Sequence, residues 1–515
     1  MTALGHWETG LPVTKRRRVA ALHASLRGRS LDLRRVRRVK FPRMKSVAII
    51  GAGVTGLTAA FYLRRRGVAV TVFEAGNRAG GVIQSVRRNG FLAECGPNTL
   101  LETSPQISQL VRDAGLQARR LDPVPQADAR FLVRDGRVLE MPASVPGFLT
   151  TKLFSWRGKL AFLREPFVSP RRDGVEESIA QFVTRRFSQE FLDHAIDALV
   201  GGIYAGDPQK LSVTYAFPRL KALEDNYGSM VKGQIFGARA RKKSGEVARD
   251  RAPKFSFDEG LQVLTDTLTA QLGDSLKLNS PVTVLEKTEP GWRVTARGET
   301  TAHDAVIFCG TARGLVELKF DAGRAALPRS LGGTTEASRQ RRSTTVDVSL
   351  FSEIKHPPVA SVVLGFRRAD VAHPCAGFGM LIPKIAGYKI LGTIFSSSLF
   401  PNRAPDGHVL LTSYVGGERY PELASLPEAQ LREVVLADLR ALLGVRGAPV
   451  FAHHTVYSRA IPQYNVGYGR FKAALAELEQ RAPDFFVAGH FRDGVSLSDC
   501  IVAGANVAER VGKTF

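Results

Sequence analysis

The sequence predicts an α/β protein, α+β overall, whose Rossmann-like nucleotide-binding domain is built from discontinuous segments. Three observations support this prediction. The apolar run Val47–Ile50 is followed by a glycine-rich turn and a helical pattern, which is how a βαβ unit begins. Strand-like runs return within residues 281–308 and 485–489. Between these segments, residues 146–227 are mostly helical in pattern, and residues 345–415 hold several β-like runs. We therefore expect a helical domain and a β-rich domain to be inserted.

The glycine-rich turn is the strongest functional signal. Gly51, Gly53 and Gly56 form G-x-G-x-x-G directly after the strand. The first glycine allows a sharp turn, the second lets the backbone approach a pyrophosphate, and the third lets the next helix pack closely. The helix expected over residues 57–66 directs its free N–H groups at that anion. The order of these parts indicates a dinucleotide-type cofactor, not glycines that serve packing alone.

The second strand, expected over residues 68–73, indicates the kind of cofactor. It ends at Glu74, an acid whose place suits hydrogen bonds to ribose hydroxyls. Arg78, Gly80 and Gly81 follow closely and resemble the second fingerprint of flavoproteins of the amine-oxidase type. In that family the glycine pair gives close backbone access near the FAD diphosphate. FAD is therefore the predicted cofactor.

The remaining elements follow from hydrophobic period and turn chemistry. Arg134 to Arg137 read as the turn of a hairpin within residues 129–142. The strands expected over 281–284, 292–296 and 305–308 are interpreted as resuming the sheet begun at Val47. A polar, basic stretch follows the helical region, and residues 241–244 are expected to form a mobile loop. Further helices are expected over 105–115, 426–443 and 498–511, and further strands over 360–366, 378–382, 390–395 and 485–489.

Composition limits the class of protein. The 515 residues are 44% hydrophobic and 23% charged, which is typical of a globular chain. No apolar run approaches the roughly 18 to 20 residues that a membrane span needs. The four cysteines show no C-x-x-C spacing, so buried free thiols in a reducing cytosol are expected and no metal is predicted. They are Cys95, Cys309, Cys375 and Cys500.

Nearly half of the net charge of +24 lies near the N-terminus. Residues 1–45 hold thirteen Lys or Arg and two acids, so this segment contributes +11. Residues 1–43 are interpreted as sequence upstream of the real start at Met44; a transit peptide and a basic arm for membrane or nucleic acid are the alternatives. The remaining excess favours an anionic ligand or a membrane surface. No nucleic-acid partner is expected, because no DNA- or RNA-binding motif occurs.

From Met44 onward the chain resembles the oxygen-dependent protoporphyrinogen oxidases and flavin-type coproporphyrinogen III oxidases, of the FAD-dependent amine oxidase-like superfamily. Besides the nucleotide motifs, the resemblance rests on LVGGIYAGDPQKLS at residues 199–212 and LGTIFSSSLFP at 391–401. VAGHFRDGVSLSDC at 487–500, AIPQY at 460–464 and the Gly96-Pro97-Asn98 turn complete it. It implies oxidation of a porphyrinogen to a porphyrin in haem biosynthesis. Six electrons leave in three flavin cycles, with O2 as acceptor giving H2O2.

The resemblance assigns site residues position by position. Arg130 matches a basic residue that holds a propionate of the tetrapyrrole, a task that suits the guanidinium fork. Gly202 matches a glycine whose carbonyl faces the macrocycle, while Ala205 stands where some relatives have glycine. Val359 and Cys375 clamp one face of the substrate, and Phe395 stacks on another ring. With Leu381 as an apolar wall and Asn98 near flavin and substrate, these complete the predicted substrate residues.

The same resemblance gives a set of cofactor residues and no acid–base residue, since flavin N5 takes the hydride. Val282 is expected to bind adenine through its backbone, and the segment 489–497 to close over the pyrophosphate and ring. The predicted cofactor residues are Gly51, Ala52, Gly53, Val54, Thr55, Gly56, Glu74, Arg78, Gly80, Gly81, Gly96, Pro97, Asn98, Val282, Gly489, Val495, Ser496 and Leu497.

The predicted domains follow. Residues 44–118, 258–310 and 475–515 form the FAD-binding domain, residues 119–135 and 311–474 the substrate-binding domain, and residues 136–257 a helical domain. By resemblance, this helical domain docks on the inner face of the cytoplasmic membrane, and the protein is otherwise cytoplasmic and a homodimer. Another amine oxidase or desaturase of the superfamily is the alternative function, and a flavoprotein that has lost catalysis is the alternative of a different class. An intact set of Gly51, Gly53, Gly56 and Glu74 argues against the latter.

Overall fold

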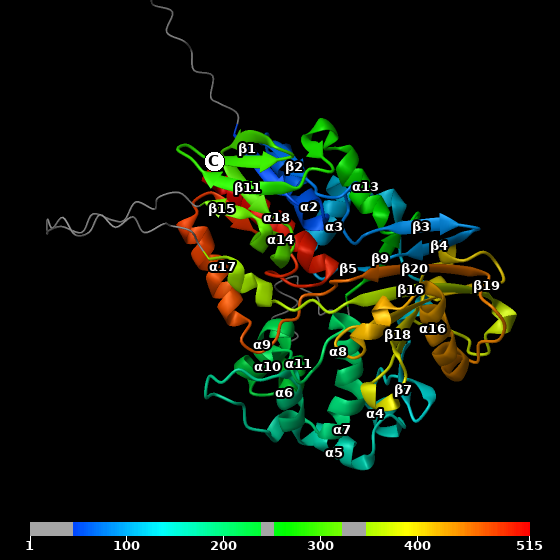
Figure 1. Ribbon diagram of the computed structural model, residues 1–515. Helices are drawn as coiled ribbons and strands as arrows, with labels where there is room; N and C mark the ends of the chain where they lie inside the picture. Colours follow the sequence, from blue (N-terminus) through cyan, green and yellow to red (C-terminus); the bar gives the residue numbers. More distant parts are fainter. Residues whose placement is uncertain (1–44, 238–251, 322–346) are drawn as a thin grey trace, which may run out of the picture. The chain divides into compact units, whose positions relative to one another are not determined.

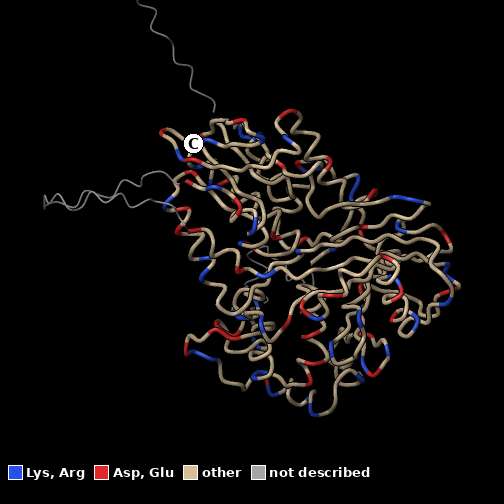
Figure 2. The backbone as a smooth tube through the Cα atoms, in the orientation of Figure 1, with Lys and Arg blue, Asp and Glu red and all other residues tan. Residues whose placement is uncertain are grey.

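The computed structural model describes residues 45–237, 252–321 and 347–515, which belong to one compact unit, Lys45–Phe515. The predictions for residues 1–43 and for the loop at 241–244 lie outside the described residues. Along the described chain, basic and acidic residues are interspersed (Figure 2).

A five-stranded parallel sheet in the order β10-β2-β1-β14-β21 lies at the centre of the nucleotide-binding part (Figure 1). Val47 and Ile49 of β1 belong to the core cluster shared with helices α2 and α18, whereas Ala48 and Ile50 belong to the cluster on the other face. Burial on both faces explains why this strand reads as a continuous apolar run. The bounds are β1 Ser46–Ile50, β2 Ala69–Phe73, β10 Leu276–Lys277, β14 Ala305–Phe308, β21 Phe485–Val487, α2 Val54–Arg65 and α18 Leu497–Thr514.

The prediction that three later strands resume the first sheet is wrong for two of them. Only β14 of the three strands expected to resume the first sheet pairs with β1. The other two, β11 (Val282–Lys287) and β12 (Trp292–Ala296), form a separate four-stranded sheet, β13-β12-β11-β15, with β13 Glu299–His303 and β15 Lys319–Asp321. Trp292 of this sheet is fully buried in the same cluster as Ile50. Apolar strand patterns do not say which edge they pair with, so the sequence could not separate the two sheets.

A seven-stranded mixed sheet, β20-β16-β19-β18-β17-β7-β8, forms the β-rich part. The predicted hairpin is present, because Arg134 of β7 pairs with Arg137 of β8. Strand β7 also runs parallel to β17, so a segment near residue 130 joins strands that lie about 250 residues later in the chain. The bounds are β7 Arg130–Arg134, β8 Arg137–Glu140, β16 Val359–Arg367, β17 Gly379–Leu381, β18 Ile390–Phe395, β19 His408–Gly416, β20 Phe451–Tyr457 and, covering one face, α16 Glu428–Leu443.

The region from residue 145 to 236 is mostly helical, and the pattern predicts this as far as residue 227; helix α11 (Met230–Phe236) beyond it was not predicted. Its interior holds a charge cluster in which the Arg186 guanidinium donates to Glu165 Oε1 and to Glu224 Oε1, both at 2.6 Å. All three side chains are fully buried, and each charge there has a partner of opposite sign. The helices are α4 Val145–Thr150, α5 Trp156–Arg164, α6 Ile179–Arg186, α7 Gln189–Phe191, α8 Asp197–Tyr204, α9 Val213–Ala216, α10 Pro218–Tyr227 and α11 Met230–Phe236.

Shorter elements connect these parts. The two-stranded sheet β3-β4 and the three-stranded sheet β5-β9-β6 bridge the nucleotide-binding and β-rich parts. These elements are β3 Ser85–Arg88, β4 Phe91–Glu94, β5 Leu100–Leu101, β6 Arg120–Leu121, β9 Lys254–Phe257, α3 Pro105–Asp113, α13 Gln262–Ala270, α14 Ala312–Glu317, α15 Ser396–Leu399 and α17 Gly469–Arg481.

Candidate active site

The first glycine loop lies where the carboxyl ends of β1, β2 and β14 meet, the edge at which open parallel sheets bind ligands. Gly51 has φ +102°, and a Cβ there would lie 3.0 Å from the Cys309 carbonyl oxygen. Gly56 lets α2 pack against the turn, because a Cβ on it would overlap the Gly51 carbonyl oxygen. Helix α2 begins one residue after Gly53, earlier than the pattern predicts, and Gly53 has no side chain to cap it. The first N–H groups of α2 thus remain available to an anion.

Glu74 and Arg78 hydrogen-bond the backbone of the two glycine turns. The Glu74 carboxylate accepts hydrogen bonds from the backbone N–H of Ala52 and of Gly76, both at 2.8 Å. Arg78 donates to the carbonyl oxygens of Ala79 and Ile83 at 3.1 Å and of Gly81 at 2.5 Å. Both side chains therefore hold backbone turns in place, in addition to any contact with a ligand.

The two glycine turns face each other. A Cβ on Gly81 would lie 3.3 Å from the Gly53 Cα, whereas a Cβ on Gly53 itself would have no protein atom within 4 Å. The two turns therefore pack closely, and the open space beside Gly53 adjoins an uncapped helix N-terminus. A pyrophosphate needs a narrow backbone cradle of this kind, and the residues present fit the FAD that the sequence predicts.

The segment 489–497 lies beside this cradle. Gly489 has φ +124°, and a Cβ on it would be 3.7 Å from Thr55 Oγ1 on α2. Its N–H donates to the Asp493 carboxylate at 2.8 Å, which fixes the loop. Val495, Ser496 and Leu497 are partly buried at the start of α18, where Ser496 forms a capping box with Asp499. Val282 is also partly buried, at the first position of β11.

The Gly96-Pro97-Asn98 turn is fixed by Tyr414, a residue that the sequence reasoning missed. Asn98 Nδ2 donates to the Tyr414 hydroxyl at 2.7 Å, and that hydroxyl donates to the Gly96 carbonyl at 2.9 Å. Burial raises the pKa of Tyr414 well above its ordinary value, although the hydrogen bond to Asn98 acts in the opposite direction. Nothing in the strand pattern of β19 marks Tyr414 as functional. Because its pKa is raised, Tyr414 keeps its proton, and its two hydrogen bonds connect the turn to the seven-stranded sheet.

Four predicted substrate residues lie on one side of this sheet, and they are Arg130, Gly202, Val359 and Leu381. Arg130, half-buried, pairs in register with Gly379, and Leu132 pairs with Leu381. Because side chains alternate along a strand, Arg130 and Leu132 share a face. Leu132 and Leu381 also share a core cluster with Ala198 of α8.

Gly202 of α8 lies against this face. A Cβ there would overlap Leu381 Cδ2, so a larger residue would force the Leu381 side chain to shift. Val359 packs with Ala205, which has φ +48°, and with Leu391 and Tyr414.

Cys375 and Phe395 are not brought to this group. Both are almost fully buried in the core cluster that contains the apolar face of α16. The Phe395 ring lies 6.0 Å from Phe131 and 5.6 Å from His373. Phe131 is adjacent to Arg130 in sequence, so it points to the opposite face. The substrate roles of Cys375 and Phe395 remain predictions.

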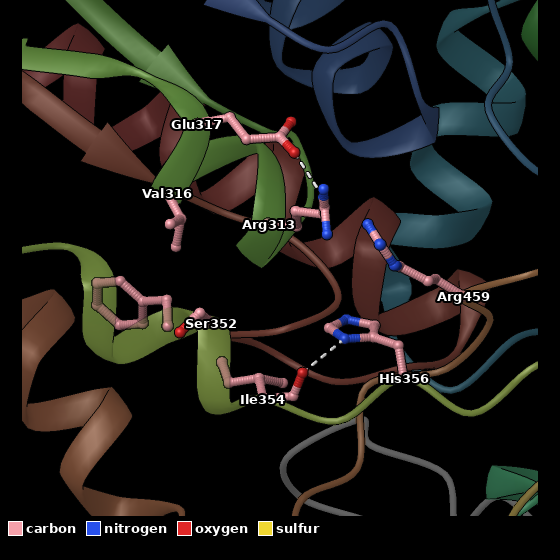
Figure 3. A pocket seen from close by; sticks show the side chains of 8 residues that line it. Arg313, Val316, Glu317, Ser352, Ile354, His356 and Arg459 are labelled. Carbon is pink, nitrogen blue, oxygen red and sulfur yellow. Dashed lines mark hydrogen bonds and ion pairs between the residues drawn. The ribbon is translucent and has the colours of Figure 1, made fainter.

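A cavity of about 320 Å³ lies between α14, the 3₁₀ helix Ser349–Glu353 and Arg459 (Figure 3). His356 Nδ1 donates to the Ile354 carbonyl at 2.9 Å, and its Nε2 is buried with no partner among the described residues. The His356 ring is 6.2 Å from His490, which follows Gly489. Burial, and to a smaller extent His356, lowers the pKa of His490 to about 4. The sequence reasoning did not identify this neutral imidazole pair.

Comparison with known proteins adds independent findings. The family described as flavin containing amine oxidoreductase matches residues 54–512. Protoporphyrinogen oxidase 2 of Arabidopsis thaliana is 34% identical over 91% of this chain and 94% of its own length. The coproporphyrinogen III oxidase of Bacillus subtilis is 28% identical over 89% of this chain and 96% of its own. A crystal structure from Exiguobacterium sp. 255-15, named as a candidate protoporphyrinogen oxidase, superposes with a TM-score of 0.74 at 22% identity, covering 92% of this chain and 99% of that one.

Proposed function

The chain belongs to the flavin containing amine oxidoreductases, and among them to the group of protoporphyrinogen and coproporphyrinogen oxidases, and on this basis we propose that it oxidises a porphyrinogen to a porphyrin in haem biosynthesis. One observation supports this function best. The glycine cradle that fits FAD continues through the Gly96–Asn98 turn into the sheet face that carries Arg130 and Leu381. A cofactor site and an apolar surface with a guanidinium thus lie on connected elements.

FAD, when bound, supplies the two-electron oxidation and passes the electrons to O2. The protein binds and orients. Arg130 offers a forked donor to a carboxylate of the substrate, and Leu381 together with the bare backbone of Gly202 gives a flat apolar wall for the macrocycle.

The hydroxyls of Tyr414 and Tyr457 donate hydrogen bonds to the backbone near the second glycine turn. Burial raises the pKa of Tyr457 to about 12 and raises the pKa of Tyr414 well above its ordinary value, so both hydroxyls stay protonated near neutral pH. Tyr457 donates to the Val82 carbonyl at 3.4 Å. These contacts hold the backbone at Val82 and Gly96 in place. The roles of the individual site residues and the domain boundaries are part of this proposal.

The testing experiment is porphyrin fluorescence after purified holoenzyme is mixed in air with protoporphyrinogen IX or coproporphyrinogen III, each corrected for spontaneous oxidation. Faster conversion of either supports the function, and the preferred one identifies the physiological substrate. Three H2O2 formed per porphyrin supports O2 as acceptor. Acceleration of neither, with FAD bound, overturns the proposal and favours another oxidase or desaturase of the superfamily.

Peripheral membrane contact through α5 is a finer part of the proposal. In the described residues, no helix is long and apolar enough to cross a membrane. Trp156, Leu160, Leu163 and Phe167 recur at helical spacing along α5 and the turn after it, and they are 70%, 57%, 53% and 84% exposed. Arg157 and Arg164 flank them. An exposed apolar stripe with basic neighbours is typical of helices that lie in a membrane interface.

Co-sedimentation with vesicles containing anionic lipid tests this contact. Trp156→Ser together with Phe167→Ser is expected to lower the bound fraction. Ile385→Ser, which changes an equally exposed apolar residue on the β-rich part, is the matched control. Equal binding of all variants contradicts the contact. A homodimer, expected from the resemblance, is tested by light scattering.

A further inference from the structure

We propose that Arg419 and Asp197 form a clamp that sets the position of α8 against the seven-stranded sheet, and with it the shape of the substrate wall formed by Gly202 and Leu381. The inference rests on the proposed function for its consequence in catalysis. Its structural part stands on contacts that involve neither cofactor nor substrate.

Arg419 joins three elements. Its Nη1 donates to the carbonyl oxygen of Ile382, directly after β17, at 2.9 Å. Its Nη2 donates to Asp197 Oδ2, at the first residue of α8, also at 2.9 Å. Arg419 itself follows the end of β19. The guanidinium, which is placed just after β19, therefore connects the start of α8 to the end of β17.

Asp197 strengthens the same junction. Its Oδ2 also accepts a hydrogen bond from the backbone N–H of Lys384 at 2.6 Å, two residues after Ile382. The side chains of Arg419 and Asp197 are only 5% and 15% exposed, so solvent screens their attraction weakly. Removing one partner leaves a buried charge with part of its contacts missing, which is costly.

The backbone around the clamp is adapted to it. A Cβ on Gly201 would lie 3.2 Å from Arg419 Nη2, so a larger residue would press on the guanidinium. At the other end of α8, the Glu418 N–H donates to the Ala205 carbonyl at 2.8 Å. The Glu418 carboxylate binds Lys210 at 2.5 Å. Neighbouring residues after β19 thus fasten both ends of one helix.

This helix and this strand carry the residues that would contact the substrate. Gly202 follows Gly201 on α8, and Leu381 precedes Ile382 at the end of β17. Gly202 is so close to Leu381 that a Cβ between them would overlap. Loosening the clamp would therefore change how closely Gly202 and Leu381 pack, and with it the shape of the apolar wall that they form together. Because a misplacement of about 1 Å can cost about 100-fold in rate, small movements here matter. Arg419 and Asp197 are positioning residues, and they set which edge groups of the macrocycle fit.

The test compares Arg419→Gln, Asp197→Asn and the double variant with the wild type as holoenzymes. We expect each single variant to lower kcat/KM for the preferred porphyrinogen about tenfold or more, less than the roughly 100-fold that a 1 Å misplacement can cost. Because the change is in a binding wall, a higher KM should account for most of this loss, with kcat changed by less than about threefold. The flavin absorbance spectrum and FAD content should stay unchanged. The double variant should be more stable than either single one, because it buries no lone charge. Arg419→Lys, which keeps the charge but not the fork, should fall between wild type and Arg419→Gln.

A second measurement does not depend on activity. Backbone hydrogen exchange in α8 should become faster in the single variants than in the wild type, while exchange in α2 stays the same. Arg186→Gln is the matched control for the loss of a buried ion pair, and Arg293→Gln for the loss of an exposed one. Arg186→Gln should lower stability without the selective rise in KM.

The outcomes separate the two proposals. A wild type that oxidises no porphyrinogen refutes the proposed function, and the exchange data still decide whether the clamp holds α8. If folded variants retain wild-type KM and wild-type exchange in α8, the clamp is refuted. It is equally refuted if the single variants lose kcat and FAD content together while KM keeps its wild-type value, which is the pattern of a general loss of folded holoenzyme.

Discussion

Alanine at Gly53 and alanine at Gly56 should separate cofactor binding from folding. Both glycines belong to the first turn, and they differ in what an added methyl group meets. At Gly53 it meets no protein atom within 4 Å, and the residue has an ordinary φ of −70°. At Gly56 it overlaps the carbonyl oxygen of Gly51 and lies 3.3 Å from Ile49.

The two magnitudes follow from these surroundings. Gly53→Ala should leave the FAD-free protein as stable as wild type, or more stable by up to about 1 kcal/mol, because alanine reduces the entropy of the unfolded chain. Its methyl group would enter the open space beside the N-terminus of α2, where the pyrophosphate is proposed to bind, so FAD affinity should fall at least about tenfold, or 1.4 kcal/mol. Gly56→Ala must displace backbone and should cost about 3 kcal/mol of stability.

The assay is thermal unfolding of FAD-free protein together with FAD titration followed by flavin fluorescence. The expected pattern is a normal melting temperature with weak FAD binding for Gly53→Ala, and a lowered melting temperature for Gly56→Ala. Gly67→Ala is unsuitable as a control because its φ of +76° adds strain. Ser275→Ala, on the 3₁₀ turn Gly273–Ser275 away from the cradle, serves instead. Wild-type FAD affinity in Gly53→Ala would refute the placement of the pyrophosphate.

Three further predictions concern single side chains. Glu74→Ala should weaken FAD retention, because it removes two backbone hydrogen bonds to a charged acceptor, each contributing about 1.5 to 3 kcal/mol; full occupancy after gel filtration contradicts this. Arg130→Ala should raise the apparent KM more than it lowers kcat, and unchanged kinetics on a propionate-bearing porphyrinogen would remove Arg130 from the site. His490 has a pKa of about 4 in the folded protein against 6.5 in the unfolded chain, so the unfolded state binds the proton more readily. The contribution of His490 to stability should therefore fall by up to about 3 kcal/mol as pH drops from 6.5 to 4, and the stability of His490→Asn should fall by correspondingly less than that of the wild type over this range. An equal slope in both proteins would contradict it.

The sequence predicted local features well because their causes are local. The apolar run before Gly51, the glycine spacing and the helix that follows depend on residues within one βαβ unit. The hairpin around Arg134 to Arg137 likewise follows from its own turn, and the pairing confirms it. The family and the FAD prediction rested on short motifs, and the comparisons support both.

The pairing of distant strands could not be read in this way. Strands β11 and β12 have patterns that suit the first sheet, yet they form a sheet of their own. Tyr414 and Arg419 stand in or just after an ordinary apolar strand, and only the approach of Asn98 and Asp197 gives them a role. The same limit applies to Phe395, whose motif predicts a substrate contact while its side chain is packed near α16.

The sequence by itself determined the fold class, the cofactor cradle and the family, since each depends on residue types at short spacing. The tertiary structure alone decided which distant residues contact each other: Gly202 and Leu381, Asn98 and Tyr414, and Asp197 and Arg419. These contacts join residues from about 180 to more than 300 positions apart. Separations of that size are set by the packing of whole sheets and helices, which no local pattern encodes.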